Sequence, residues 1–372
     1  EDQDTKIVEA KNITFKNERR TIELSINKKT KATEWNQYVN EESEKLQEDK
    51  PLEGAFLGLY SQNEIKDRDL NVIVEKDTLL EVVKSDKDGK VSFKTDLPFG
   101  DYYVQEIKAP IGYQLSTEKI EFTILPTDSK ENVIKKEALL YNVPTLVEIA
   151  KEDLVNESKL VEGAALVVTD STGKVIDSWI TKKKKHYIKN LVAGQKYTLT
   201  ENLPATGYVT AESIDFVIKS FATNGDTKIQ VQKQVMKDDH TKVQISKGDI
   251  TSGKELPGAK LEIRNKKGEV VDSWVSSNTP RFIEYLPIGN YTLTETMAPD
   301  GYEVAETVKF SVKDTGEIQK VVMKDAKKTH ENKKKEKEPS KTPKTGDTSL
   351  LKLWILLFIA SISSWFILRR SH

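Results

Sequence analysis

Apolar and polar residues alternate along many short segments of the chain. In three of these segments a tyrosine, an aliphatic residue and a glutamate occupy every second position: Tyr102, Val104 and Glu106; Tyr197, Leu199 and Glu201; Tyr291, Leu293 and Glu295. Residues two apart in a β-strand lie on the same face. The pattern therefore predicts three strands whose inward face ends in a carboxylate, and a buried carboxylate needs a partner.

The segments around these glutamates also repeat. Each predicted glutamate strand follows a turn such as Leu286-Pro287-Ile288-Gly289, and each is followed by a Gly-Tyr pair. Short alternating strands with turn signals between them predict antiparallel β-sandwiches. We expect an all-β chain with three tandem Ig-like or prealbumin-like sandwich domains over residues 1–145, 146–240 and 241–326.

The first repeat is longer than the others because residues 31–50 are inserted after its opening strand. Trp35, Tyr38 and Leu46 are spaced loosely at helical intervals, so the insert is expected to be a short helix or an ordered loop. Residues 327–341 are rich in lysine and glutamate without apolar periodicity, which predicts an extended linker.

Each repeat begins and ends with a strand whose inward face carries a reactive residue type. The opening strands end in Lys28, Lys151 and Lys247, and the closing strands end in Asn142, Asp238 and Asp325. If the two strands are neighbours, amine and carbonyl groups meet beside the glutamate in a dry interior.

Desolvation favours the uncharged forms of these groups, and a neutral lysine is a nucleophile. A protonated glutamate can polarise the Asx carbonyl and then transfer protons. The predicted products are the isopeptide bonds Lys28–Asn142, Lys151–Asp238 and Lys247–Asp325, with Glu106, Glu201 and Glu295 as proton shuttles. The alternative is a set of buried salt-bridge networks without covalent chemistry.

Composition excludes several classes of function. The 372 residues carry a net charge of −1, which gives no global field to attract nucleic acid, and the chain has no cysteine for disulfides or thiolate sites. Histidines are scattered, and no nucleotide-binding loop or metal-ligand spacing is present. We therefore expect no cofactor, no metal, and no enzymatic activity on an external substrate.

The C-terminus carries a membrane-spanning pattern. Leu350 to Leu368 is apolar and long enough to cross a bilayer, and Arg369 and Arg370 would hold its end in the cytoplasm. No signal peptide precedes Glu1, so the numbering is expected to begin at the mature N-terminus.

In combination, these motifs resemble the Cna-B-type (SpaA-like, prealbumin-like) domains of Gram-positive surface proteins and pilins. The resemblance covers nearly all of residues 20–326. It implies that Glu106, Glu201 and Glu295 are the family's E-box glutamates and that Lys28, Lys151 and Lys247 form the crosslinks. The usual partner is Asn, as at position 142, and Asp238 and Asp325 are the aspartate variant.

Residues 342–372 resemble a sortase sorting signal, which consists of a pentapeptide, an apolar span and a basic tail. Thr342-Pro343-Lys344-Thr345-Gly346 has threonine where the Leu-Pro-x-Thr-Gly pattern has leucine. The resemblance implies cleavage between Thr345 and Gly346 and transfer of Thr345 to a cell-wall or pilin amine.

These features together predict a secreted, peptidoglycan-anchored protein of a Gram-positive cell wall. The expected role is a minor, basal pilus subunit whose partners are sortase, peptidoglycan and other pilin subunits. The alternative is a stand-alone adhesin that binds a host matrix protein through its first domain, with Trp35 and Tyr38 as exposed contact residues. Local packing is the other interpretation of these two aromatics.

Overall fold

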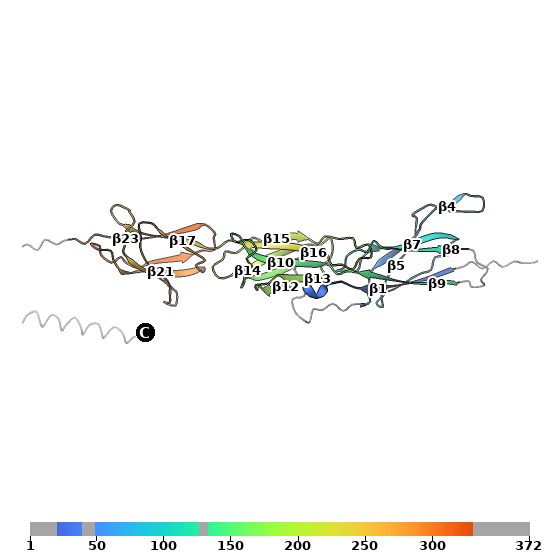
Figure 1. Ribbon diagram of the computed structural model, residues 1–372, viewed down its shortest axis with the longest axis horizontal. Helices are drawn as coiled ribbons and strands as arrows, with labels where there is room; N and C mark the ends of the chain where they lie inside the picture. Colours follow the sequence, from blue (N-terminus) through green and yellow to red (C-terminus); the bar gives the residue numbers. More distant parts are fainter. Residues whose placement is uncertain (1–20, 39–48, 126–132, 330–372) are drawn as a thin grey trace, which may run out of the picture. The chain divides into compact units, whose positions relative to one another are not determined.

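The computed structural model describes residues 21–38, 49–125 and 133–329, and these residues are almost entirely β-structure (Figure 1). The helical element within these ranges is one turn of 3-10 helix, η1 (Trp35–Tyr38). Across the same ranges, no helix has the length and apolar character that a membrane crossing needs. The pentapeptide at 342–346 and the apolar segment at 350–368 lie outside the described residues.

The first domain is a sandwich of two sheets with an additional hairpin. One sheet has the order β6-β1-β9, the other has the order β5-β2-β7-β8, and β3 pairs with β4. The strands are β1 (Thr21–Thr30), β2 (Phe56–Ser61), β3 (Ile65–Lys66), β4 (Val72–Val74), β5 (Leu79–Lys84), β6 (Lys90–Phe93), β7 (Gly100–Lys108), β8 (Lys119–Ile124) and β9 (Val133–Asn142).

The second domain repeats this plan without the hairpin, with sheets β13-β10-β16 and β12-β11-β14-β15. Its strands are β10 (Leu146–Asp153), β11 (Ala165–Asp170), β12 (Val175–Ile180), β13 (His186–Lys189), β14 (Lys196–Leu203), β15 (Ile214–Val217) and β16 (Val231–Asp238).

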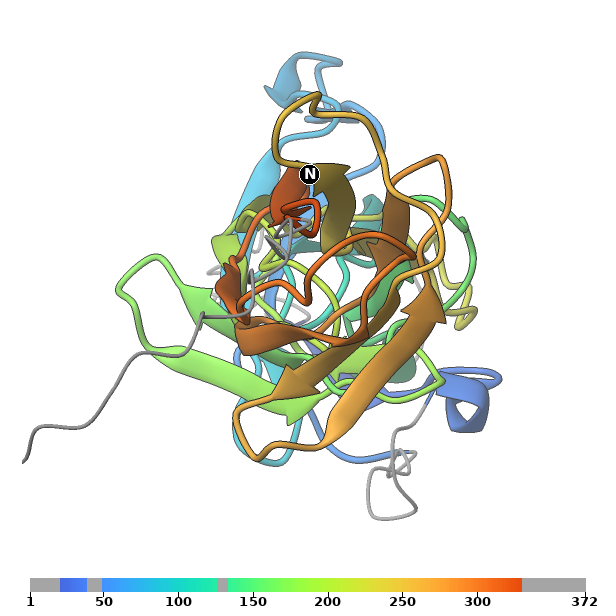
Figure 2. The same cartoon turned by 90° about the vertical axis from the view of Figure 1, so that its left-hand side faces the viewer.

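The third domain has the same two sheets, in the orders β20-β17-β23 and β19-β18-β21-β22. Figure 2 shows its layers in gold to red. Its strands are β17 (Lys242–Asp249), β18 (Lys260–Asn265), β19 (Val270–Val275), β20 (Arg281–Glu284), β21 (Gly289–Met297), β22 (Val308–Val312) and β23 (Ile318–Asp325).

The first and last strands of each domain are hydrogen-bonded neighbours, which is the condition that the predicted crosslinks require, but they run parallel. The expectation of purely antiparallel sandwiches is therefore wrong for this pair. The last strand follows a strand of the opposite sheet, so the chain crosses between the layers and re-enters the three-stranded sheet in the direction of the first strand. Parallel neighbours require such a crossover connection.

The alternating residues of both sheets fill one apolar core in each domain. In β14 the buried positions are Tyr197, Leu199 and Glu201, with more exposed residues between them. Equivalent cores surround Tyr102 and Val104 in the first domain and Leu293 in the third. The predicted inward face of each glutamate strand is thus confirmed.

Candidate functional site

Each domain brings its predicted lysine, glutamate and Asx together between its two sheets. The lysine and the Asx lie on the first and last strands of the three-stranded sheet, and the glutamate lies on β7, β14 or β21 of the facing four-stranded sheet. In the first domain Lys28 is paired with Leu140 of β9. Asn142 is two residues further along β9, so its side chain lies on the same face as that of Leu140. The same offset recurs in the other two domains.

In the first domain the carboxylate of Glu106 bridges the two other groups. Lys28 Nζ lies 3.1 Å from Glu106 Oε1, and Asn142 Nδ2 donates a hydrogen bond of 2.8 Å to Glu106 Oε2. Asn142 Nδ2 also donates to the backbone oxygen of Gln114 at 2.8 Å. The carboxylate therefore contacts both the amine and the amide nitrogen that a crosslinking reaction would release.

The environment of Lys28 favours the neutral amine. Its side chain and that of Glu106 have no exposed surface. Burial lowers the pKa of Lys28, and this effect exceeds the opposing effect of the neighbouring Glu106. A desolvated amine with a depressed pKa is the form in which lysine acts as a nucleophile.

In the second domain, Lys151 contacts both carboxylates. Its Nζ lies 3.0 Å from Glu201 Oε1 and is also ion-paired with Asp238. Burial raises the pKa of Asp238 to about 7; the ion pair with Lys151 opposes this rise, and Glu201 adds to it. A protonated Asp238 is therefore accessible near neutral pH.

The third domain repeats this arrangement. Lys247 Nζ lies 3.0 Å from Glu295 Oε1 and is ion-paired with Asp325. Burial raises the pKa of Asp325 as well, against the effect of Lys247. One oxygen of each aspartate, Oδ2 of Asp238 and of Asp325, is buried without a hydrogen-bond partner. Such unsatisfied buried oxygens are unfavourable in a permanent ion pair.

A further group that sequence reasoning missed holds each glutamate in place. A backbone N–H ten positions after the glutamate donates to its Oε2 atom: Ser116 to Glu106 at 2.8 Å, Ala211 to Glu201 at 2.6 Å and Ala305 to Glu295 at 2.6 Å. The constant spacing and the small residue at each position were visible in the sequence. A backbone donor leaves no side-chain signature, which is why the pattern was not recognised.

The insert of the first domain packs against protein. Trp35 is buried, with 3% of its surface exposed, and its cluster includes Val143, Leu146 and Ile229. Tyr38 packs edge-on against Tyr187 at 5.6 Å between ring centroids. For Trp35 the interpretation as local packing is therefore confirmed, and the alternative of an exposed ligand contact is wrong, because this aromatic fills an apolar cluster. Residues 39–48 of the insert lie outside the described residues.

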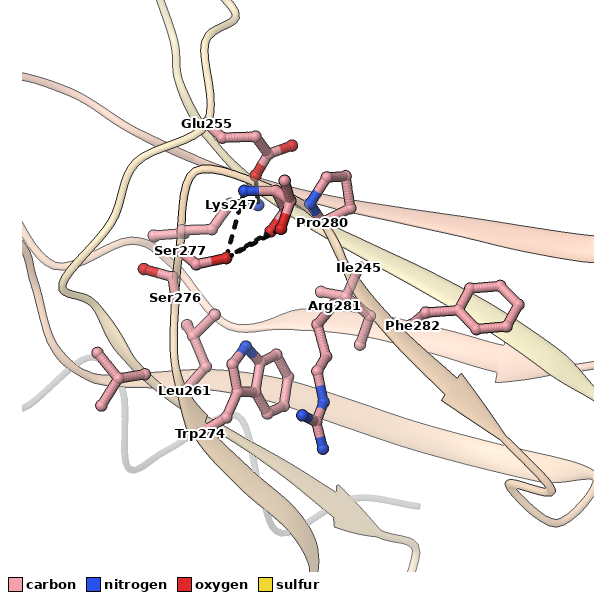
Figure 3. A pocket seen from close by; sticks show the side chains of 12 residues that line it. Ile245, Lys247, Glu255, Leu261, Trp274, Ser276, Ser277, Pro280, Arg281 and Phe282 are labelled. Atoms are coloured by element: carbon pink, nitrogen blue, oxygen red, sulfur yellow. Dashed lines mark hydrogen bonds between the residues drawn. The ribbon is translucent and has the colours of Figure 1, made fainter.

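A pocket of about 300 Å³ borders the triad of the third domain (Figure 3). It lies between the edge strands β19 and β20, with Trp274 and Arg281 on its walls. Lys247 is a lining residue, and its backbone N–H donates to Glu255 Oε2 at 3.1 Å. Glu295 and Asp325 do not line this pocket, and the side chain of Lys247 is only 2% exposed, so the reactive groups of the third triad are buried beside it.

The chain is similar in structure to several Gram-positive proteins. It matches the Bacillus anthracis TIE protein with 25% identity and a TM-score of 0.41, over 83% of this chain and 51% of that protein. It matches BcpA, the major pilin subunit of Bacillus cereus, with 15% identity and a TM-score of 0.34, over 83% and 100% of the two chains. It matches the major pilin SpaD of Corynebacterium diphtheriae with 14% identity and a TM-score of 0.38, over 86% of this chain and 99% of that protein.

The chain thus spans about half the length of the Bacillus anthracis TIE protein. No curated protein sequence matches it. The model of the SpaA prealbumin-like fold domain matches three consecutive segments, residues 42–138, 145–235 and 241–327. These segments cover well over half of the chain. The third contains the whole third sandwich, the second ends within β16, and the first begins after β1 and ends within β9. The chain therefore belongs to the family of SpaA prealbumin-like fold domain proteins.

Proposed function

We propose that this protein is a cell-wall-anchored structural protein, a minor pilus subunit that links the fibre to peptidoglycan. Self-formed isopeptide bonds between Lys28 and Asn142, Lys151 and Asp238, and Lys247 and Asp325 stabilise its domains. The observation that carries the proposal is the buried lysine–glutamate–Asx triad between the first and last strands of every domain.

In the first domain the reaction is a transamidation. The neutral Nζ of Lys28 attacks Cγ of Asn142, a proton from Nζ passes through the Glu106 carboxylate to Nδ2, and the Cγ–Nδ2 bond breaks. The products are one amide bond and one ammonia. The proposal is supported by the position of Glu106 between the two groups, with one oxygen 3.1 Å from Nζ and the other 2.8 Å from Nδ2.

In the second and third domains the reaction is a condensation. A neutral lysine amine attacks the protonated carboxyl of Asp238 or Asp325, and the carboxyl oxygen leaves as water after a proton passes through Glu201 or Glu295. Burial raises the pKa of both aspartates, which favours their protonated, electrophilic forms.

The position of the bonds suits a protein under tension. The first and last strands are the two ends through which force enters and leaves a domain, and they are parallel neighbours. A covalent bond between them carries the load past the interior of the sandwich. The three bonds join residues 114, 87 and 78 positions apart, respectively, so nearly the whole of each domain is enclosed.

Anchoring is proposed to occur through residues 342–346. Sortase would cleave between Thr345 and Gly346 and join Thr345 to peptidoglycan, while the charged linker at 327–341 separates the domains from the wall. The apolar segment at 350–368 would retain the chain at the membrane until cleavage.

The role is tested in the producing bacterium with Thr345→Ala and, as a matched control, Thr348→Ala, which changes a threonine outside the pentapeptide. The wall is digested with muramidase, and pilus polymers are quantified in the wall and medium fractions. We expect polymers to stay with the wall in the wild type and in Thr348→Ala, and to appear in the medium in Thr345→Ala. Unchanged wall attachment in Thr345→Ala would overturn the basal role.

A further inference from the structure

The loop that follows the E-box strand of the first domain, residues 114–117, supplies two groups to the triad. The backbone N–H of Ser116 donates to Glu106 Oε2, and the backbone oxygen of Gln114 accepts a hydrogen bond from Asn142 Nδ2. Gln114 and Ser116 are themselves almost completely buried. The position of this loop therefore determines where the carboxylate and the amide lie.

The opposite side of the same loop is held by the second domain. The backbone N–H of Phe221 donates to Gln114 Oε1 at 2.8 Å, and that of Thr223 donates to the backbone oxygen of Leu115 at 3.1 Å. Asn224 N adds a hydrogen bond of 3.2 Å to Thr117 Oγ1. Residues 221–224 lie between β15 and β16 of the second domain. The second domain therefore holds, by hydrogen bonds, the first-domain loop that positions Glu106 and Asn142; we call this contact a clamp.

The second and third domains repeat the clamp with different residues. Ala211 N donates to Glu201 Oε2, and the neighbouring Thr210 donates through N and Oγ1 to Asp314 Oδ1 and Oδ2, at 2.8 and 2.6 Å. Asp314 lies between β22 and β23, the position in the third domain that corresponds to residues 221–224 in the second.

The third domain provides the internal comparison. Ala305 N holds Glu295 Oε2 as in the other two domains. The structure describes no domain after the third. Among the described residues, this loop is held from the end of its own domain, where Glu303 N donates to the backbone oxygen of Ala326 at 2.9 Å.

We propose that docking of each following domain completes the reactive site of the domain before it. Gln114 and Asp314 are the positioning residues of this coupling, and they act through the loops that hold Glu106 and Glu201. The inference rests on the proposed isopeptide chemistry. It follows that crosslinks form in the first and second domains when their joints assemble, while the third crosslink depends on neither of these two joints.

The test follows the three crosslinks separately in the full-length chain. Protein is labelled in a short synthesis pulse and chased, and the three branched peptides released by trypsin are quantified by mass spectrometry. Gln114→Met keeps the side-chain length but removes the acceptor for Phe221 N–H, whereas Gln114→Glu retains an acceptor oxygen. Asp314→Ala and Asp314→Asn form the corresponding pair at the contact between the second and third domains. Asp314 is exposed, so these substitutions should affect folding little.

We expect Gln114→Met to slow the first crosslink about fivefold, the factor for one ordinary hydrogen bond, and to leave the other two unchanged. Asp314→Ala should slow the second crosslink alone, and the variants that retain an acceptor should restore at least part of the rate. A simple loss of folding would affect the crosslinks without this domain-specific pattern.

Wild-type rates of all three crosslinks in both Gln114→Met and Asp314→Ala would overturn the coupling and leave the isopeptide chemistry intact. Equal slowing of all three crosslinks would also overturn it. Absence of every branched peptide from the wild type would overturn the chemistry and the coupling together.

Discussion

Lys28 and Glu106 come from opposite sheets of the first domain, and their Nζ and Oε1 atoms lie 3.1 Å apart with no exposed surface on either side chain. The other two domains repeat this relationship at 3.0 Å. A buried ion pair contributes little to stability compared with apolar residues of the same volume. The recurrence of such a pair beside an Asx residue in every domain is better explained by its chemistry.

Replacement of a glutamate should remove both a crosslink and its contribution to stability. In Glu201→Ala, Lys151 and Asp238 remain unlinked, and the loop closed by the bond is released in the unfolded chain. The expected loss is about 4–5 kcal/mol of unfolding free energy for that domain on the loop-entropy model. Chemical denaturation measures it, with exposed Glu212→Ala as the matched control. Equal stability of the two variants would show that no such constraint exists.

The uncrosslinked second domain should become less stable as pH rises. Asp238 has its pKa raised to about 7 by burial, above its ordinary value near 4. A raised pKa in the folded state means that folding favours the protonated carboxyl. Asp238 stays buried in Glu201→Gln. The free energy of unfolding of this variant should therefore be greatest below about pH 4, and it should decrease as the pH rises from about 4 to about 7.

The control for this pH dependence is Glu201→Gln combined with Asp238→Asn, which cannot titrate at position 238. Denaturation midpoints at a series of pH values distinguish the two proteins. If both show the same slope between pH 4 and 7, the slope has another source and the account of Asp238 is wrong.

Replacement of Trp35 should disturb packing. Its cluster joins the insert to Val143 and to Leu146 and Ile229 of the second domain, so Trp35→Ala removes a buried aromatic at a loss of about 3–5 kcal/mol. Phe99→Ala, at a residue with 54% of its surface exposed, should have little effect. Differential scanning calorimetry measures both. Loss of binding to a host matrix protein in Trp35→Ala at unchanged stability would instead favour the adhesin role.

Three glycines at equivalent positions allow the contacts between neighbouring domains to be tested. Gly112, Gly207 and Gly301 have φ values of +82°, +84° and +83°, so alanine imposes similar backbone strain at each. An added Cβ would lie 2.7 Å from the backbone oxygen of Asn190 at Gly112 and 2.5 Å from that of Tyr285 at Gly207, whereas nothing lies within 4 Å at Gly301.

Gly112→Ala and Gly207→Ala should therefore loosen the first and second joints, respectively, beyond the effect of Gly301→Ala. Hydrogen exchange at the domain-linking residues 143–145 and 239–241 measures this. A similar change in exchange for all three variants would mean that the close approaches at the joints are not maintained in solution.

The sequence carried the information for the sandwich cores and the triads because alternation fixes which side chains point inward. Lys28, Glu106 and Asn142 all continue an apolar face, and this is why they could be selected together without a structure. The parallel pairing of the first and last strands was not predictable in the same way, since alternation is identical in parallel and antiparallel strands.

The joints between domains were also missed. They depend on backbone donors such as Phe221 N and on single turn residues such as Asp314, which follow no hydrophobic period. The sequence allowed local packing for Trp35 but could not name its partners, because its apolar neighbours include residues almost two hundred positions away, such as Ile229. The domain boundaries at 145 and 240 stay a prediction at the level of single residues.

The central claim is tested most directly by the intact mass of recombinant residues 1–341, in the wild type and with Glu106, Glu201 or Glu295 changed to alanine. The account predicts a wild-type mass that is two waters and one ammonia below the calculated value. It further predicts that Glu106→Ala restores the ammonia and that the other two variants each restore one water. A wild-type mass equal to the calculated value would contradict the account, because the triads would then be buried polar networks without covalent bonds.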